Sequence, residues 1–417
     1  MKFGPFCLLT ATFWPLPSLA AEPTPNLPPA EIVIRVLRAN PAVQAAGSNL
    51  QAEEANRSRL ESGQYEWNVR LGGQQRKTYP NNNSNERFSE WNAALERPLR
   101  LPGKASVDAE LGAAGVNLAT TAQGDALHET SRNLLKSWFV WLRENAAAKQ
   151  WAEQVALLGQ QTRAVQRRQQ LGDAAKLETI QGEAALAQAQ AQHSQAQLRE
   201  RTASEDLRRR FPGLPLEAPA RIAEPSVIEG EEATWLAEIL EHSHELGIAR
   251  GETQKAQMLA DRSRRDRLPD PTLGVHVSSE RGGEEHVMGA YISIPIPGGA
   301  RRSGADAAFA RANAASFHEA YSVQNVSAAA GALYHSAKAA RASWQANQGA
   351  AEKLTRAAEM TARAYQLGEG SLSDLLSNRR LANEAQLAAR LAQLDALELR
   401  YRTTSASAQK FLARQRL

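Results

Sequence analysis

The sequence predicts a mostly α-helical chain with a small β part, written as one structural unit repeated twice. A glycine turn at Tyr365–Leu376 separates two very long segments with helical patterning, and a weaker copy of this turn lies at Gln169–Ile180. Aligning Leu171-Gly172 with Leu367-Gly368 offsets the two copies by about 196 residues. Two long antiparallel coiled-coil helix pairs, related by a tandem repeat, are therefore the basis of the predicted fold.

The composition favours long helices over large compact cores. Aromatic residues make up only 6% of the 417 residues, and alanine, glutamine, arginine and glutamate are abundant. The net charge of +4 comes from dispersed arginines without the interleaved aromatic residues that stack on bases. We therefore expect no nucleic-acid partner.

Residues 1–20 have the pattern of a signal peptide. Lys2 precedes an apolar stretch, and Ser18-Leu-Ala20 has the small-x-small spacing of a cleavage site. The mature chain is therefore expected to begin at residue 21, outside the cytoplasm. Cys7, the only cysteine, lies within this leader, so the mature protein should have neither a disulfide nor a thiolate metal site. No later run has the length and apolarity of a spanning helix, so membrane insertion would have to use β-strands.

The first structural repeat is expected at residues 21–210. Ala30–Ser62 is patterned as an amphipathic helix. Tyr65–Leu71 alternates apolar and polar residues, and Phe88–Glu96 does so again beyond a polar loop at Lys77–Arg87, which predicts a β-hairpin.

A long helical pair completes this repeat. Gly103–Gln170 contains no proline and would be roughly 100 Å long as a helix. The chain turns at Leu171–Ala175 and returns through Lys176–Arg210.

A proline-rich linker at residues 211–226 leads into the second repeat, residues 227–417. This repeat is expected to follow the same order of helix, hairpin and long helical pair. Its predicted elements are Glu231–Arg267, Pro271–Ser278, a loop at Glu280–His286, Val287–Ile296, Gly299–Gln366 and Leu372–Leu412.

Four strands cannot close on themselves, whereas a sheet in lipid must leave no open edge. Two copies would supply eight strands and three copies twelve. Eight strands leave an interior filled by side chains, whereas twelve can leave an aqueous lumen. The polar faces of the strands call for water inside and favour the trimer; they carry Glu66, Asn68, Arg70, Glu90 and Asn92.

The chain resembles the TolC-like outer-membrane efflux factor family from about residue 30 to residue 411. The resemblance rests on the tandem repeat, on the turn Tyr365-x-x-Gly-x-x-Ser-x-x-Asp374, and on Leu95–Lys104. The last segment, Leu-Glu-Arg-Pro-Leu-Arg-Leu-Pro-Gly-Lys, is similar to the strand-to-helix corner of the heavy-metal (CzcC-like) branch. The resemblance implies a homotrimer with a twelve-stranded transmembrane β-barrel and a periplasmic α-helical tunnel, placed in the Gram-negative outer membrane.

The function implied by the resemblance is that of an exit duct in a tripartite efflux system. Its partners would be a periplasmic adaptor (membrane fusion protein), an inner-membrane proton-driven efflux pump and outer-membrane lipid. The branch implies metal cations as cargo, and drugs or other small solutes are the alternative. A soluble periplasmic coiled-coil scaffold is the structural alternative, although the outward aromatics of Tyr65–Leu71 suit a lipid interface. The sequence carries no catalytic motif, and we expect neither an enzyme nor a cofactor.

The resemblance also assigns a gate. In the family, a tyrosine before the second-turn glycine links to an acid after the first-turn glycine, and these correspond to Tyr365 and Glu178. A ring of aspartates corresponds to Asp374, for which helix capping is the alternative role. Gly370 stands where some members carry a further linking arginine, and Ser377 stands where some carry a second aspartate, so closure should be weaker.

The two glycine turns are assigned to the rim that contacts the adaptor. This adaptor-contact rim comprises Leu171, Gly172, Asp173, Ala174, Leu367, Gly368, Glu369, Gly370 and Ser371. Other candidates have simpler explanations. His242 and His244 are spaced poorly for a chelate on one helix, and His286 lies in a predicted loop. Trp138, Trp141 and Trp151 are expected in helix packing.

Overall fold

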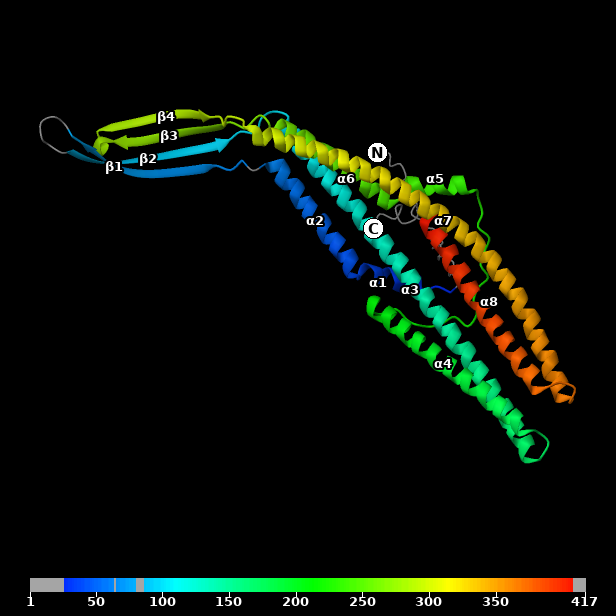
Figure 1. The fold of residues 1–417 in the computed structure, drawn as a ribbon. Coiled ribbons are helices and arrows are strands. Elements are labelled where there is room, and N and C mark those ends of the chain that lie inside the picture. Colours follow the sequence, from blue (N-terminus) through cyan, green and yellow to red (C-terminus); the bar gives the residue numbers. More distant parts are fainter. Residues whose placement is uncertain (1–25, 64, 80–85, 408–417) are drawn as a thin grey trace, which may run out of the picture.

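The computed structural model describes residues 26–63, 65–79 and 86–407. The predicted signal peptide, with Cys7, lies outside the described residues, as does the end of the last predicted helix. Figure 1 shows an elongated molecule with a four-stranded sheet at one end and the tips of two helical hairpins at the other. The elements follow one another as α1-α2-β1-β2-α3-α4 and then α5-α6-β3-β4-α7-α8, with a short 3-10 turn between β3 and β4.

The long helices form two hairpins. The first pairs α3 (Lys104–Gln170) with α4 (Lys176–Arg210), and the second pairs α7 (Gly299–Gln366) with α8 (Leu372–Ser407). The predicted helices match the observed α3, α4 and α7 within one residue at each end. At about 1.5 Å per residue, the 67 residues of α3 and the 68 of α7 each span roughly 100 Å.

The single helix expected before the first β-hairpin is wrong, because the chain forms two helices there. These are α1 (Ala30–Arg38) and α2 (Pro41–Ser62). The side chain of Asn40 accepts a hydrogen bond of 3.0 Å from the backbone N–H of Ala42 and so caps α2. Proline at the first position of a helix needs no N–H partner, which favours a new start at this point.

The helix expected at Glu231–Arg267 is also two helices, α5 (Glu232–His242) and α6 (His244–Arg265). The hydroxyl of Ser243 accepts a hydrogen bond of 3.3 Å from the N–H of Leu246 and caps α6. The two histidines therefore belong to different helices rather than to successive positions of one helix.

The sheet has the strand order β1-β2-β3-β4, with every neighbouring pair antiparallel. Its strands are β1 (Asn68–Thr78), β2 (Glu86–Pro98), β3 (Thr272–Glu280) and β4 (Glu285–Ser293). The first strand begins at Asn68, three residues later than predicted, and the hydroxyl of Tyr65 donates a hydrogen bond of 2.8 Å to Asp270 at the base of the sheet. The connecting loops are shorter than predicted, and residues 80–85 lie outside the described residues.

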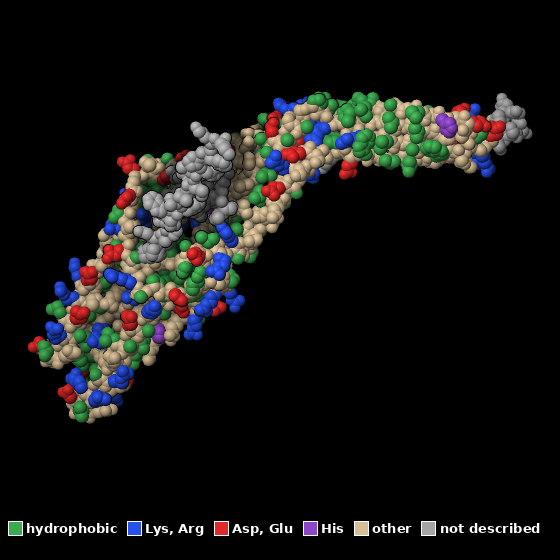
Figure 2. All heavy atoms as spheres, turned by 180° about the vertical axis from the view of Figure 1, so that it is seen from behind, with side chains coloured by type: hydrophobic (Ala, Val, Ile, Leu, Met, Phe, Trp, Pro, Cys, Tyr) green, Lys and Arg blue, Asp and Glu red, His purple; other side chains and the backbone are tan. Residues whose placement is uncertain are grey.

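The register gives the sheet one apolar and one polar face. Leu71 pairs with Ala93, and Leu95 pairs with both Val69 and Val275, which places these side chains on one face. This apolar face is exposed: 76% of Leu71 is accessible to solvent. Figure 2 shows hydrophobic side chains gathered over the sheet, whereas charged side chains dominate the helical part.

The polar face carries paired charges. Arg70 contacts Glu96 at 2.8 Å, and Arg76 contacts Glu90 at 3.0 Å. The alternation predicted for β1, β2 and β3 is therefore present in the structure.

The helices form a single layer rather than a compact bundle. Near the sheet, α2 packs on α3, α3 on α6, and α6 on α7. Nearer the tips, α4 packs on α3 and α7 on α8, with α3 and α8 in contact between the two hairpins.

The main core lies midway along the molecule, where α1 and the linker cross the long helices. Trp138 and Trp141 are buried there with their rings 4.8 Å apart. The indole N–H of Trp138 donates to the backbone oxygen of Asn26 at 2.8 Å. These two tryptophans therefore serve packing, as the sequence predicts.

Candidate functional site

The two hairpin tips are built in the same way. Just beyond the ends of α3 and α7, each hairpin turns at a glycine in the left-handed conformation, Gly172 at φ 81° and Gly368 at φ 79°. The N–H after each glycine reaches back to a helical carbonyl, from Asp173 to Arg168 at 2.8 Å and from Glu369 to Ala364 at 2.9 Å. This is the Schellman motif, in which glycine avoids the strain that a Cβ atom would cause.

The tips expose most of the predicted adaptor-contact rim. Leu171 and Leu367 are 80% and 70% exposed, although leucine normally contributes to stability by burial. Among the described atoms, none lies within 4 Å of a Cβ added at Gly172 or Gly368. The tips therefore present bare backbone and two leucines at the far end from the sheet (Figure 1).

Tyr365 links the tips of the two hairpins. Its hydroxyl, at the end of α7, donates a hydrogen bond of 3.1 Å to the Glu178 carboxylate at the start of α4. Burial and this bond to Glu178 raise the pKa of Tyr365, which keeps the hydroxyl protonated and able to donate. The structure thus brings together the first two predicted gate residues within a single chain.

Arg168 joins this link, although no sequence motif marks it. Its guanidinium donates to the Tyr365 hydroxyl at 3.0 Å and lies over the tyrosine ring, 5.6 Å from the ring centre. It also donates to the carboxylate and the backbone oxygen of Asp173, each at 2.9 Å. Arg168 therefore connects the first turn to the second hairpin. Its position five residues before Asp173 is a local signal, but the partner Tyr365 is distant in sequence.

A small apolar cluster lies between the two hairpins, next to the tips. Val165 of α3 is 1% exposed and packs with Leu372 and Leu375 at the start of α8. Tyr365 packs against the edge of this cluster. The cluster fixes the spacing of the hairpins at the level where the Tyr365–Glu178 bond forms.

The third predicted gate residue, Asp374, lies elsewhere. Its backbone N–H donates to the Ser371 hydroxyl at 3.0 Å, and the Ser371 hydroxyl donates to its carboxylate at 2.7 Å. Ser371 is therefore the N-cap of α8, and its hydroxyl is also bonded to the Asp374 carboxylate. The carboxylate is exposed, so both roles considered for Asp374 stay open: the helix cap is present, and its charge faces solvent.

A polar seam continues between α3 and α8 above the tips. The Gln150 amide donates to the side-chain oxygens of Asn383 and Gln386, each at 3.0 Å. Arg379 donates to Gln161, and burial lowers the pKa of its guanidinium. Between the apolar cluster at the tips and the main core, polar side chains thus join α3 to α8.

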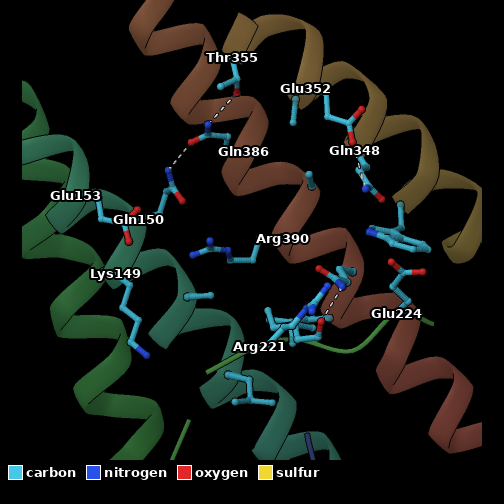
Figure 3. Close-up of a pocket in the computed structure, with 18 of the residues that line it drawn as sticks. Lys149, Gln150, Glu153, Arg221, Glu224, Gln348, Glu352, Thr355, Gln386 and Arg390 are labelled. Atoms are coloured by element: carbon cyan, nitrogen blue, oxygen red, sulfur yellow. Dashed lines mark hydrogen bonds between the residues drawn. The ribbon is translucent and has the colours of Figure 1, made fainter. Parts of the chain in front are cut away.

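A cavity of about 1540 Å³ lies beside this seam, and Gln150 of α3 and Gln386 of α8 are part of its lining. The linker at residues 218–224 crosses one side of it, and α7 lines another. Figure 3 shows Arg390 reaching from α8 toward α3 across the cavity, with the Gln150–Gln386–Thr355 hydrogen bonds beside it. Acidic and basic side chains both line the walls, so the cavity has no single sign of charge.

Two further observations concern the described residues only. No group of three or more His, Cys, Asp or Glu side chains is placed to hold a metal ion in this part of the chain. Among its helices, none has the length and apolarity needed to cross a membrane.

Known proteins resemble the chain in structure. No protein-family model matches the sequence, and no curated protein was found to be related to it. The CmeC outer membrane channel of Campylobacter jejuni is similar with a TM-score of 0.73 at 16% identity, covering 91% of this chain and 84% of CmeC. The outer membrane protein VceC of Vibrio cholerae is similar with a TM-score of 0.72 at 14% identity, covering 91% and 94% of the two chains.

CusC is a third similar structure, known from crystal structures that concern folding and transmembrane channel formation. It gives a TM-score of 0.75 at 15% identity, covering 91% of this chain and 90% of CusC. The chain therefore has the fold of outer-membrane channel proteins. The predicted fold class, long helical hairpins with a four-stranded antiparallel sheet, is confirmed, whereas these likenesses do not single out a heavy-metal branch.

Proposed function

We propose that the protein is the outer-membrane exit duct of a tripartite efflux system and acts as a homotrimer. The observation that carries the proposal is the sheet, which exposes a whole apolar face and, within the described residues, pairs β1 and β4 on one side only. Such a sheet would aggregate in water, whereas a closed ring of copies in lipid would satisfy both its face and its edges. The likeness in fold to outer-membrane channels supports the same conclusion.

Three copies suit the polar face. Twelve strands close into a barrel wide enough for an aqueous lumen, whereas eight leave an interior filled by side chains. The pairs Arg70–Glu96 and Arg76–Glu90 on the polar face require water rather than a dry interior.

The outer helices supply a second argument for repeated copies. On α7, the exposed Phe317 and Tyr321 lie on the side opposite the buried alanines that face α6, and the exposed Phe309 lies on its flank; 77% of Phe317 is exposed. On α2, the side away from α3 carries small exposed residues at heptad spacing: Ala45, Ser48, Ala52 and Ala55. Large side chains on one edge can therefore insert between small ones on the opposite edge of the next copy.

These two edges also lie at the same height. Counted from the sheet at ~1.5 Å per residue, Phe317 lies roughly 27 Å along α7 and Ala45 roughly 26 Å along α2. A contact between different edges of identical chains is heterologous and generates a closed ring when the rotation per copy allows it.

In this proposal the barrel lies in the Gram-negative outer membrane and the helical hairpins extend into the periplasm. The exposed tips, with Gly172 and Gly368, contact the periplasmic adaptor, and the adaptor connects the duct to an inner-membrane proton-driven pump. Small residues at the tips let helical hairpins of a partner approach closely. The role is passive conduction, and no catalytic step is proposed.

Metal cations are the proposed cargo. The support is the resemblance of Leu95–Lys104 to the heavy-metal branch, together with the exposed carboxylate of Asp374 at the tip. Three copies would place three such carboxylates around one axis, where they attract cations. Drugs or other small solutes are the alternative cargo for the same duct.

Fractionation followed by conductance measurements tests the proposal. The protein should be recovered with outer membranes, require detergent for release, migrate as a trimer and form channels in planar bilayers. Recovery as a soluble periplasmic protein would contradict it and favour the coiled-coil scaffold. For the cargo, a deletion strain should become sensitive to divalent or monovalent metal ions, and sensitivity to organic dyes alone would favour the drug alternative.

A further inference from the structure

The corner where the helices meet the sheet contains a network of charges. It comprises three cations and three anions: Arg100, Lys104, Arg262, Asp108, Asp266 and Asp270. Two of its members, Arg100 and Lys104, belong to the Leu95–Lys104 segment, which the proposed function uses only as a family resemblance. Equal numbers of each charge allow it to be neutral overall.

Lys104 is the most buried member, with 2% of its side chain exposed. Its ammonium lies 3.1 Å from the Asp266 carboxylate, 3.0 Å from the Asp270 carboxylate and 2.7 Å from the backbone oxygen of Leu268. An ammonium has three N–H donors, so its hydrogen-bonding capacity is filled. All three acceptors belong to the connection from α6 to β3, whereas Lys104 begins α3 after β2.

Asp270 extends the network to two other connections. One of its oxygens accepts from the backbone N–H of Leu101 at 3.0 Å, and the other accepts from the Tyr65 hydroxyl at 2.8 Å. Burial and the bond to Asp270 raise the pKa of Tyr65 to about 12, so this hydroxyl remains a donor at physiological pH. Tyr65 lies between α2 and β1.

Arg100 and Arg262 connect the helices α2, α3 and α6 to this network. Arg100 contacts Asp108 at 3.3 Å and donates to the backbone oxygens of Leu60 and Glu61 at the end of α2. Arg262 of α6 pairs with Asp108 of α3 at 2.5 Å. The Asp266 backbone oxygen accepts a bond of 2.7 Å from Arg301 in the first turn of α7. All four passages between helix and strand are therefore connected to this one network.

The geometry of the sheet shows why such a joint matters. The 13 residues of β2 span roughly 43 Å at ~3.3 Å per residue. A tilt of only about 7° at the corner would displace the far end by about 5 Å, which is the spacing of neighbouring strands. Edge strands of separate copies could not then pair in register.

We infer that Lys104 is the positioning residue that holds the sheet at one fixed angle to the helical part, by neutralising the two aspartates that precede β3. Removing the ammonium leaves Asp270 without a cation and Asp266 with Arg262 alone, so the two carboxylates repel each other across the position that the ammonium occupied. The corner then opens, and the sheet moves independently of the helices. This inference concerns a single chain and stands apart from the proposed channel function.

Distance measurement between two spin labels tests the inference. The only cysteine is Cys7, in the predicted leader, so the exposed positions Gln75 on β1 and Glu110 on α3 can be labelled through Gln75→Cys and Glu110→Cys. In this background Lys104→Met should at least double the width of the distance distribution. Lys255→Met is the matched control, since Lys255 pairs with Glu53 at 3.2 Å between α6 and α2, away from the corner.

A second variant separates charge from packing. Adding Asp266→Asn and Asp270→Asn to Lys104→Met removes the repulsion and should restore a narrow distribution. The inference would be overturned if the distance distribution were as narrow in Lys104→Met as in Lys255→Met. Broadening that the two asparagines do not reverse would also overturn it, because lost packing would then be the cause. Neither outcome depends on whether the protein conducts.

Discussion

The hydroxyl of Tyr365 and the carboxylate of Glu178 meet at 3.1 Å, although 187 residues separate them in the chain. One residue ends α7 and the other begins α4, so this bond ties the second hairpin to the first at their tips. Arg168 donates to the same hydroxyl from the end of α3. Three of the four long helices are thus connected through one phenolic oxygen.

Tyr365→Phe should increase the open fraction of the channel. A hydrogen bond of this kind contributes about 1 kcal/mol, which corresponds to about a fivefold shift in the ratio of open to closed tips. Single-channel recording in planar bilayers measures it as a higher mean conductance. Tyr79→Phe, at an exposed position next to the sheet, is the control and should leave conductance unchanged. Equal conductance in the two variants would remove Tyr365 from the gate.

Asp374 and Ser371 allow the gate and the helix cap to be separated. Asp374→Asn keeps an oxygen for the Ser371 hydroxyl but removes the charge, so cation selectivity and block by divalent ions should fall. Ser371→Ala removes the cap at a cost of about 1 kcal/mol in stability but keeps the charge, so selectivity should persist. Reversal potentials in asymmetric salt measure selectivity. If Ser371→Ala alters selectivity and Asp374→Asn does not, the cap alone explains Asp374.

Substitution of the tip glycines should prevent export without preventing assembly. Gly172→Val and Gly368→Val place a β-branched side chain at positive φ, which strains the turn, and they add bulk where the proposed adaptor approaches. Trimers should still form, because the tips lie at the far end from the sheet. Gly349→Val, within α7 and at ordinary φ, is the control for bulk in a helix. Wild-type export by both tip variants would exclude the rim assignment.

Cysteine crosslinking should detect the contact between neighbouring copies. Phe317→Cys together with Ala45→Cys, or Phe309→Cys together with Ala52→Cys, should give dimers and trimers on oxidation, visible on a non-reducing gel. The corresponding single-cysteine variants are the controls and should stay monomeric on that gel. Crosslinks confined to the single variants would indicate a symmetric contact instead of the heterologous one.

The corner should become labile in acid partly through Asp270. Burial alone would raise the pKa of Asp270, but hydrogen bonds from the Leu101 N–H, Lys104 and Tyr65 outweigh it and hold the pKa below its usual value. A carboxyl with a lowered folded-state pKa stabilises the fold above its unfolded pKa, and this contribution disappears as pH falls through the lowered value. The free energy of unfolding should therefore fall as the pH is lowered through this range, which urea titrations at a series of pH values measure.

The comparison with Asp270→Asn isolates this group from the other carboxylates. At neutral pH the variant should have a lower free energy of unfolding than wild type, and its free energy of unfolding should fall less on acidification. Parallel curves for the two proteins would show that Asp270 does not report the acid transition.

The sequence predicts the long helices well because their ends are set by local chemistry. Gly103, Gly172 and Gly368 stand at turns that need positive φ, and the intervening segments lack helix breakers. Elsewhere, local capping outweighs periodicity. Asn40-Pro41 and Ser243 begin new helices, although the amphipathic pattern continues through both positions and predicts continuous helices.

The long-range parts of the site could not be predicted from residues alone. Tyr365 and Glu178 were assigned through a family resemblance, and the structure places them in contact. The role of Arg168 cannot be read from the sequence, because its partner Tyr365 is brought near only by the fold. Lys104 looks like an ordinary first-turn residue, and only the packing of α3 beside α6 shows that it is buried between aspartates.

The strand order has a consequence for biogenesis. Glu96 on β2 and Tyr291 on β4 are hydrogen-bonded across the sheet, yet they lie 195 residues apart in the chain. At a synthesis rate of about 5–20 residues per second, the first hairpin precedes its partner by roughly 10–40 s. During that interval the apolar face of the first hairpin is exposed, and the edge of β2 lacks its partner strand β3. Until the second hairpin has been synthesised, this exposed face and edge favour aggregation of the nascent chain.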